Sequence, residues 1–231
     1  MSTMTLHLTD IAESVRSTHG SANTNSPSRA LLYRDGCKRL FDLSVTLLTA
    51  MIWLPLVAVL AALVALDGHK PFYSQRRVGR DGRIFRMVKL RTMVADADQA
   101  LVRYLEENAE ARAEWDATQK LKNDPRITPI GRILRITSMD ELPQLLNVLL
   151  GDMSIVGPRP FMESQKGLYP GLGYYRVRPG ITGLWQVSDR NDSAFAYRAV
   201  LDDEYERTLS FPTDMSILKR TVGAVLSCSG Y

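Results

Sequence analysis

The feature that most limits how this chain can fold is an uncharged apolar run from Leu43 to Leu66. The run has 24 residues, and a helix needs ~20 apolar residues to cross the hydrocarbon core of a bilayer. A soluble protein can also bury an apolar helix, but an uncharged run of this length favours a membrane segment. We therefore expect these residues to hold the chain in a membrane.

A proline and the flanking charges restrict the path of this segment. Pro55 lies almost at its centre, where it removes a backbone donor and breaks or kinks a helix. Each half is then about 18 Å long at ~1.5 Å per residue, too short for ~30 Å of hydrocarbon. The positive-inside rule places both flanks in the cytoplasm, so we predict a re-entrant helix hairpin broken at Pro55, with a kinked single span as the alternative. The flanking basic residues are Arg34, Lys38 and Arg39 before the run, and Lys70, Arg76, Arg77 and Arg80 after it.

The segment from Lys70 to Arg91 is strongly basic, with eight Lys and Arg residues and one acid, Asp81. Such a block suits the phosphate groups of nucleotides, lipids or nucleic acids, although a solvated basic loop has the same composition. A nucleic-acid partner is disfavoured, because the sequence has no RNA-binding signature and the membrane segment would be unexplained. No cysteine or histidine cluster has the spacing of zinc ligands.

The remaining patterns predict an α+β fold that is mostly helical. Residues 71–93 mix β-branched and aromatic residues with glycine, which indicates short strands around a turn. Residues 95–120 have the period of an exposed amphipathic helix. The basic, apolar-faced stretch 124–136 fits either an amphipathic interfacial helix or an ordinary packed one. We expect a buried or membrane-contacting helix at 144–150 and two further helices within 194–220.

Two adjacent carboxylates, Asp140 and Glu141, lie just before the helix expected at Gln144. Ser138 and Glu141 have the spacing of a capping box, so a helix start alone would explain these residues. The second explanation is chemical, because a helix N-terminus favours an ionised carboxylate and a bound phosphate. An ionised Asp can attack phosphorus to give an acyl phosphate, and Arg135 lies close enough to bind phosphate oxygens.

Two glycine- and proline-containing motifs follow. Arg159 lies between two prolines, which restrict its backbone and suit its guanidinium to bidentate phosphate binding, or else form a rigid turn with an incidental Arg. In residues 178–183 the glycines permit positive φ or the close approach of a ligand. Trp185 and the polar residues 188–191, Arg190 among them, offer stacking and polar contacts that a nucleotide could use.

Taken together, these motifs resemble the bacterial sugar transferases, the monotopic phosphoglycosyl transferases that start glycan assembly on undecaprenyl phosphate. The resemblance extends from Lys38 to the C-terminus. It is carried by 38–42 (KRLFD), Pro55, 89–93 (KLRTM), Arg135, Ser138 with 140–144 (DELPQ), 157–160 (GPRP), 178–183 (RPGITG), Asp203, Tyr205, Asp214, Ile217 and Thr221.

The resemblance implies an enzymatic activity and roles for these residues. Asp140 would attack the β-phosphate of a UDP-sugar, release UMP and carry the sugar phosphate until undecaprenyl phosphate accepts it. Glu141 would act as a general base toward the lipid phosphate or support the metal, which is Mg²⁺ in this family and is expected to contact Asp140. Phosphate or substrate binding is expected of Lys89, Arg91, Arg135, Arg159, Gln144 and Arg190.

The resemblance also implies how the chain is organised and where it works. We expect a disordered N-terminal tail (1–32), the re-entrant membrane helix (33–67) and a cytoplasmic, membrane-associated catalytic domain (68–231). The expected location is the cytoplasmic face of the bacterial inner membrane, with membrane lipids as partners and a homo-oligomer as an open question. One residue departs from the family, since Leu54 precedes Pro55 where serine is common. Thr46 or Thr49 could supply the missing hydroxyl.

Residues 183–191 resemble the branch of the family that starts exopolysaccharide synthesis with galactose or glucose phosphate. Two alternatives stay open. One is the same reaction with an N-acetylated amino sugar. The other is a non-enzymatic, membrane-anchored basic binding module, which predicts that Asp140→Asn leaves function intact.

Overall fold

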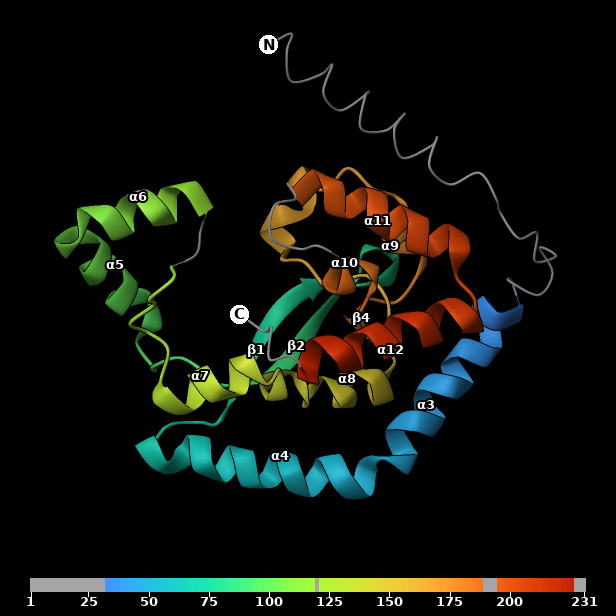
Figure 1. Cartoon of the computed structure of the whole chain (residues 1–231), viewed down its shortest axis with the longest axis horizontal. Coiled ribbons are helices and arrows are strands. Elements are labelled where there is room, and N and C mark those ends of the chain that lie inside the picture. The colour runs from blue at the N-terminus through green and yellow to red at the C-terminus, as the bar shows by residue number, and fades with distance from the viewer. Residues whose placement is uncertain (1–31, 119–120, 189–194, 227–231) are drawn as a thin grey trace, which may run out of the picture.

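The computed structural model describes residues 32–118, 121–188 and 195–226 (Figure 1). Within these ranges the chain is mostly helical and has two small two-stranded sheets, which confirms the predicted α+β, mostly helical class. The predicted N-terminal tail, residues 1–32, lies outside the described residues except for Leu32. The two helices predicted within 194–220 are present as α11 (Phe195–Thr208) and α12 (Phe211–Leu226).

In chain order, the helices and strands are a π-helix (Tyr33–Cys37), α3 (Lys38–Leu48), α4 (Ala50–Val64), a 3-10 turn (Ala65–Asp67), β1 (Phe72–Val78), a 3-10 turn (Arg80–Gly82), β2 (Ile84–Leu90), α5 (Ala97–Glu107), α6 (Ala109–Thr118), α7 (Pro129–Ile136), a 3-10 turn (Met139–Glu141), α8 (Gln144–Leu150), β3 (Ser154–Val156), a 3-10 helix (Glu163–Leu168), α9 (Gly173–Arg176), β4 (Gly180–Thr182), α10 (Leu184–Val187), α11 (Phe195–Thr208) and α12 (Phe211–Leu226).

Both sheets lie next to the residues singled out in the sequence. Strands β1 and β2 form the predicted antiparallel hairpin, with Phe72 opposite Leu90 and Val78 opposite Ile84. Its turn places Asp81 at a positive φ of 58°, which Asp tolerates better than most residues. Strands β3 and β4 pair in parallel and bring the motif at 157–160 beside the motif at 178–183.

The amphipathic segment 95–120 is two helices and not the single helix that its periodicity predicted. Asn108 leaves the helical region with φ −134° and ψ 99°, and its side chain accepts a hydrogen bond of 3.0 Å from the N–H of Ala111. This is N-cap chemistry, which competes with continuation of the preceding helix. The two helices, α5 and α6, form an arm that stands apart from the body in Figure 1.

The break in the apolar segment lies at Thr49, which corrects the prediction that it lies at Pro55. Thr49 separates α3 from α4, whereas Pro55 lies inside α4. The hydroxyl of Thr49 donates to the carbonyl of Val45 at 2.7 Å, and the Trp53 indole N–H donates to the carbonyl of Thr46 at 3.0 Å. Threonines that bond back to such carbonyls bend helices. Because α4 starts anew after the bend, Pro55 falls in its second turn and removes one backbone donor without ending the helix.

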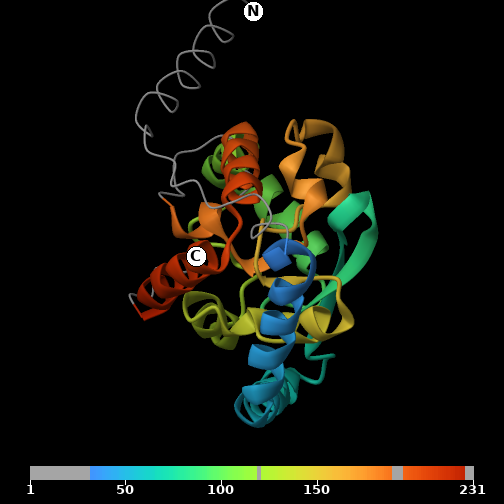
Figure 2. The same ribbon diagram turned by 90° about the vertical axis from the view of Figure 1, so that its right-hand side faces the viewer.

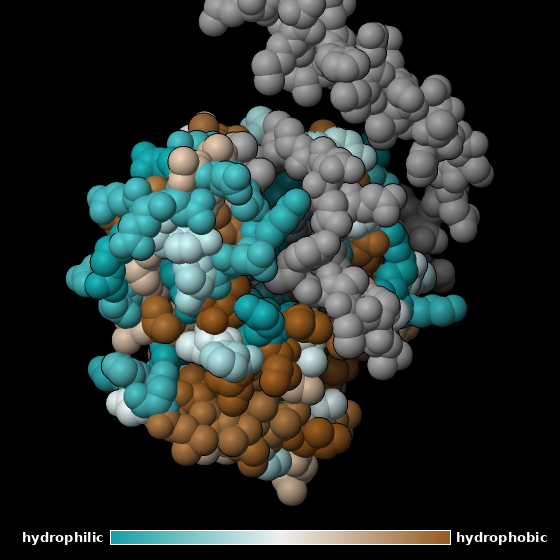
Figure 3. All heavy atoms as spheres, turned by 60° about the vertical axis from the view of Figure 1, so that its left-hand side comes forward, coloured by the Kyte–Doolittle hydropathy of each residue, from teal (hydrophilic) through white to brown (hydrophobic). Residues whose placement is uncertain are grey.

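Helix α4 presents most of its apolar surface outward. It runs beneath the body while α3 passes up one side, as the two ribbon views agree (Figures 1 and 2). In the segment Ala50–Asp67 the mean hydropathy is 2.3 and only 17% is buried. A core helix of a soluble protein would be mostly buried, so within the described residues α4 is the one helix suited to a membrane. Figure 3 shows the hydrophobic surface gathered on this side of the molecule. The re-entrant path stays a prediction.

Helix α3 is fixed to the C-terminal helices by a buried charge cluster, here called the anchor cluster: Tyr33, Lys38, Asp42, Tyr205 and Asp214. The Asp214 carboxylate is fully buried and accepts hydrogen bonds from Lys38 at 2.6 Å, Tyr33 at 2.7 Å and Tyr205 at 2.8 Å. Asp42 accepts the backbone N–H of Ile155 at 3.1 Å. Motif residues that are far apart in the sequence therefore join α3, and through it the apolar helix α4, to the C-terminal helices α11 and α12.

Candidate active site

Asp140 and Glu141 lie in the 3-10 turn between α7 and α8. Ser138, which begins this turn, has a left-handed backbone with φ 56° and makes no side-chain cap hydrogen bond to the described backbone. The capping-box explanation of these residues is therefore not supported. A non-glycine residue held at positive φ is strained, and such strain concentrates at functional sites.

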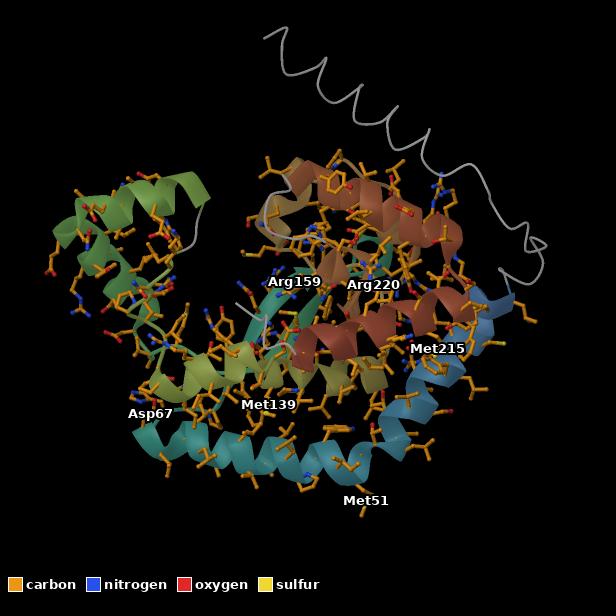
Figure 4. The ribbon with its side chains drawn as sticks, viewed as in Figure 1. Met51, Asp67, Met139, Arg159, Met215 and Arg220 are labelled. Atoms are coloured by element: carbon orange, nitrogen blue, oxygen red, sulfur yellow. The ribbon has the colours of Figure 1, made fainter. Side chains whose placement is uncertain are left out.

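The turn and the apolar helix α4 share a buried hydrophobic cluster. Met139, the residue before Asp140, packs against a buried cluster that contains Ala61 and Val64 of α4 and Leu134 of α7. In Figure 4 Met139 lies on the α4 side of the turn and Arg159 lies on the opposite side. The carboxylate pair is thus held between the apolar helix and the basic β1–β2 hairpin.

Glu141 is held by two cations. Its Oε1 lies 2.6 Å from Lys89 Nζ and 3.4 Å from Arg159 Nη2. Burial acts to raise the pKa of Glu141, but Arg159 and Lys89 outweigh burial and lower this pKa to about 2. Glu141 is therefore an ionised carboxylate at neutral pH, with its Oε1 paired to both cations.

Asp140 differs from its neighbour in both pairing and pKa. Its nearest cation in the described chain is Lys89, at 3.7 Å, and 12% of its side chain is exposed. Burial raises the pKa of Asp140 above its ordinary value, and the Glu141 charge raises it further, against the opposing effect of Lys89, Arg135 and Arg159. Divergent pKa values in two adjacent carboxyl groups are typical of divided roles in catalysis. The weakly paired member is Asp140.

Arg159 is held in place by the backbone on both sides of it. The N–H of Gly157 donates to Thr182 O and the N–H of Gly180 donates to Pro158 O, both at 2.8 Å. A Cβ on Gly180 would lie 2.1 Å from the backbone N of Gly157, so only glycine fits. These glycines thus permit the close approach of two backbone segments. From the sequence alone, positive φ or the close approach of a ligand was expected there.

A small pocket joins several of the predicted site residues. Its volume is about 10 Å³, room for about one water molecule. Glu141 and the predicted residues Lys89, Arg159 and Gln144 line it, with Gln144 almost fully buried. Arg77 also lines the pocket. It lies within the basic segment 70–91 but was not predicted as a site residue. The full lining is Arg77, Met87, Lys89, Glu141, Gln144, Arg159, Pro160, Gly180 and Ile181.

The other predicted binding residues lie elsewhere or beside this pocket. The Arg135 charge acts on Asp140, and its Nε donates to Thr92 Oγ1 at 2.9 Å. Arg91 is bound to both carboxylate oxygens of Asp67, at 2.6 and 2.7 Å, and to the carbonyl of Val64 at the end of α4. These bonds give Arg91 a structural role. Arg190 lies outside the described residues.

A magnesium ion at these carboxylates would have to be held partly by substrate. The described residues contain no group of three His, Cys, Asp or Glu side chains that could hold a metal. Mg²⁺ commonly uses one or two carboxylates together with substrate phosphates and water, so it does not need such a cage. Asp140 is the available ligand, because the Oε1 of Glu141 already faces two cations.

Comparison with known proteins identifies relatives over most of the chain. The family model described as "Bacterial sugar transferase" matches residues 33–228. The UDP-galactose-lipid carrier transferase of Erwinia amylovora is 48% identical over 195 residues, 84% of this chain and 41% of that protein. The exopolysaccharide production protein ExoY of Rhizobium meliloti is 43% identical over 196 residues, 84% of this chain and 87% of that one.

A third relative is named for a different sugar. The UDP-glucose:undecaprenyl-phosphate glucose-1-phosphate transferase of Caulobacter vibrioides is 35% identical over 201 residues, 82% of this chain and 70% of that protein. The chain thus spans most of the length of the Rhizobium and Caulobacter proteins but less than half of the Erwinia protein.

Proposed function

The chain belongs to the bacterial sugar transferase family, and from that premise we propose that it is a phosphoglycosyl transferase of exopolysaccharide synthesis. It transfers a hexose 1-phosphate from a UDP-sugar to undecaprenyl phosphate and releases UMP. The observation that carries this proposal is the unequal carboxylate pair. Asp140 is weakly paired, with one cation at 3.7 Å, whereas Glu141 is ion-paired with both Lys89 and Arg159.

In the first step, a carboxylate oxygen of Asp140 attacks the β-phosphorus of the donor. The bond from this phosphorus to the bridging oxygen breaks, UMP leaves with that oxygen, and the sugar phosphate remains on Asp140 as an acyl phosphate. Lys89, Arg135 and Arg159 provide positive charge where the phosphoryl oxygens gather charge.

In the second step, an oxygen of undecaprenyl phosphate attacks the same phosphorus. The bond to the Asp140 oxygen breaks, which frees the carboxylate and gives an undecaprenyl diphosphate sugar. A bound Mg²⁺ would be held by Asp140 and phosphate oxygens and would neutralise part of their charge.

The geometry argues against the general-base role considered for Glu141 and favours a role different from both of those expected from the sequence. A carboxylate with a pKa of about 2 is a weak base at neutral pH. Its two short ion pairs instead fix the positions of Lys89 and Arg159. We therefore assign Glu141 the role of positioning the phosphate-binding cations.

The placement of the turn supports a reaction at the membrane surface. Asp140 follows Met139, which packs against a buried cluster that includes residues of α4, and α4 exposes a largely apolar surface. Exposed apolar side chains also lie on the neighbouring helices α7 and α8: Ile133, Ile136, Leu146 and Leu150. A carboxylate at headgroup level can meet both a soluble nucleotide sugar and a lipid phosphate, and we place it on the cytoplasmic face of the bacterial inner membrane.

The donor sugar is proposed from the relatives. The Erwinia protein is named for galactose and the Caulobacter protein for glucose. We therefore propose galactose or glucose, with an N-acetylated amino sugar as the alternative.

Release of UMP by the full chain in nanodiscs, with Mg²⁺ and undecaprenyl phosphate, tests the function. UDP-galactose, UDP-glucose and UDP-N-acetylglucosamine are compared in parallel, with Asp140→Asn as the control. We expect turnover with one hexose donor that requires the lipid phosphate and disappears in the variant. Folded protein that releases UMP from none of the three donors would favour the non-enzymatic binding module.

A further inference from the structure

Arg77 is a guanidinium in the wall of the active-site pocket whose charge is not balanced nearby. Its Nη1 donates to the carbonyl of Pro160 at 3.2 Å and its Nη2 to Gln75 Oε1 at 2.5 Å. Both acceptors are neutral. Its Nε is buried and has no hydrogen-bond partner among the described residues.

Other buried arginines in the structure have a carboxylate beside them. Arg126 lies 2.7 Å from Asp124 and Arg198 lies 3.5 Å from Asp202. For Arg77 no carboxylate lies within 4 Å in the part of the chain that the structure describes. Burial, Arg159 and Arg198 together lower the pKa of Arg77 to about 10. Arg77 is partly buried, and a cation drawn out of water beside other cations destabilises the fold unless an anion accompanies it.

The pocket lining contains more positively charged than negatively charged side chains. Glu141 is the one acid in its lining, and its Oε1 already faces Lys89 and Arg159. Arg77 is the remaining cation, so the anion that completes the pocket must come from outside the described chain. Arginine suits this task, because its planar fork binds phosphate oxygens in pairs.

We propose that Arg77 is a substrate-binding residue that contacts a phosphate oxygen, and this inference rests on the proposed function. The phosphate belongs either to the nucleotide sugar or to the lipid acceptor, since both present the same chemistry to the pocket. A purely structural role is the competing explanation, because the bond to Pro160 also holds the turn that carries Arg159.

The first experiment needs no catalytic turnover. The thermal midpoint of the full chain in nanodiscs is measured with and without UMP, and with and without inorganic phosphate, for wild type, Arg77→Gln and Arg76→Gln. Arg76 is the matched control, because it neighbours Arg77 on β1 but its side chain is 65% exposed and pairs with Glu163 on the surface. Glutamine at position 77 can still donate to the Pro160 carbonyl while its charge is gone.

We expect UMP or phosphate to raise the midpoint of wild type and Arg76→Gln, and to leave Arg77→Gln unchanged. Without ligand, Arg77→Gln should be at least as stable as wild type. A ligand-induced rise that survives in Arg77→Gln, or one that is missing in wild type, overturns the proposal. Should Arg77→Gln not fold, Arg77→Lys replaces it, and an undiminished rise in that variant overturns the proposal equally.

Kinetics of Arg77→Lys then identify the source of the phosphate. A KM for the UDP-sugar raised roughly 10- to 100-fold, the loss expected for a hydrogen bond to a charged group, assigns Arg77 to the donor. The same rise in the KM for undecaprenyl phosphate assigns it to the acceptor. A lowered kcat with both KM values unchanged marks a residue that only supports Arg159 and contradicts the proposal. Since the thermal measurement involves no transfer, it decides the role of Arg77 even if none of the donors reacts.

Discussion

Two of the buried groups of charged residues in the described chain differ in how their carboxylates are paired, the anchor cluster around Asp214 and the active-site group around Asp140. In the anchor cluster, Asp214 is fully buried and accepts three hydrogen bonds of 2.6 to 2.8 Å. In the active site, Asp140 has one cation at 3.7 Å and a partly exposed side chain. A carboxylate whose partners are complete stabilises the fold, whereas one with incomplete pairing remains available for a substrate.

The largest effect that separates the two groups is expected for Asp140→Asn. Removal of the nucleophile should lower the rate of transfer by at least about 10³-fold. Stability at neutral pH should not fall, because burial already raises the pKa of the Asp140 carboxyl and disfavours its charge. UMP release and thermal unfolding measure the two properties on the same sample. A large drop in the thermal midpoint would place Asp140 with the structural residues.

The reverse behaviour is expected for Asp214→Asn. This change leaves the Lys38 ammonium buried without its carboxylate, which costs about 3–5 kcal/mol of the free energy of unfolding. Chemical denaturation in detergent measures the loss. Asp81→Asn is the control, since Asp81 is exposed and an amide tolerates its positive φ. Equal stability of the two variants would show that the anchor cluster does not hold α3.

Glu141→Gln tests whether the active site also contributes to stability. The depressed pKa of Glu141, about 2, gives stability that is present above its ordinary value of 4.5 and is lost as the pH falls toward 2. That contribution is about 3 kcal/mol at neutral pH. We expect the variant to lose less stability than wild type between pH 4.5 and 2, as measured by urea unfolding.

The same variant should transfer sugar phosphate roughly 10- to 100-fold more slowly, because Lys89 and Arg159 lose the carboxylate that holds them. Asp152→Asn, which lies outside the carboxylate pair, serves as the control for both measurements. Acid profiles that coincide for wild type and Glu141→Gln would contradict the ion pairs described here.

The smallest effect is expected for Tyr33→Phe. This change removes one of the three hydrogen bonds to Asp214 and leaves the Lys38 ion pair in place. A bond to a charged group contributes about 1.5–3 kcal/mol, and the remaining partners reduce the loss to the lower end of that range. Urea unfolding of wild type and Tyr33→Phe under the same conditions measures this loss in the free energy of unfolding. The rate of transfer per folded molecule should not change, and a reduced rate would show that the two groups are coupled.

Sequence motifs predicted four of the residues that line the pocket but not Arg77. Asp140, Glu141, Lys89, Arg159 and Gln144 were predicted from ordered motifs, and the structure brings the last four into one pocket. Nothing in the sequence distinguishes Arg76 from its neighbour Arg77. Because side chains alternate between the two faces of a strand, only Arg77 lines the pocket. The sequence contains no marker of which face of β1 is buried.

Two other differences arise from contacts distant in the sequence or from competing local signals. Arg91 was expected to bind phosphate or substrate, whereas in the structure its guanidinium is bound to Asp67, 24 residues earlier. Pro55 was the strongest local signal for a helix break. The bend instead lies at Thr49, where threonine hydroxyls and the Trp53 indole bond to backbone carbonyls.

The buried cluster that Met139 shares with α4 has a mechanical consequence. Met139 directly precedes the carboxylate proposed to attack phosphorus, and the cluster also contains Ala61 and Val64 of α4. With α4 placed in the lipid as proposed, the depth of this helix would set the height of that carboxylate above the bilayer. A fragment without α3 and α4 would lose part of the packing next to its proposed nucleophile together with its most apolar helix.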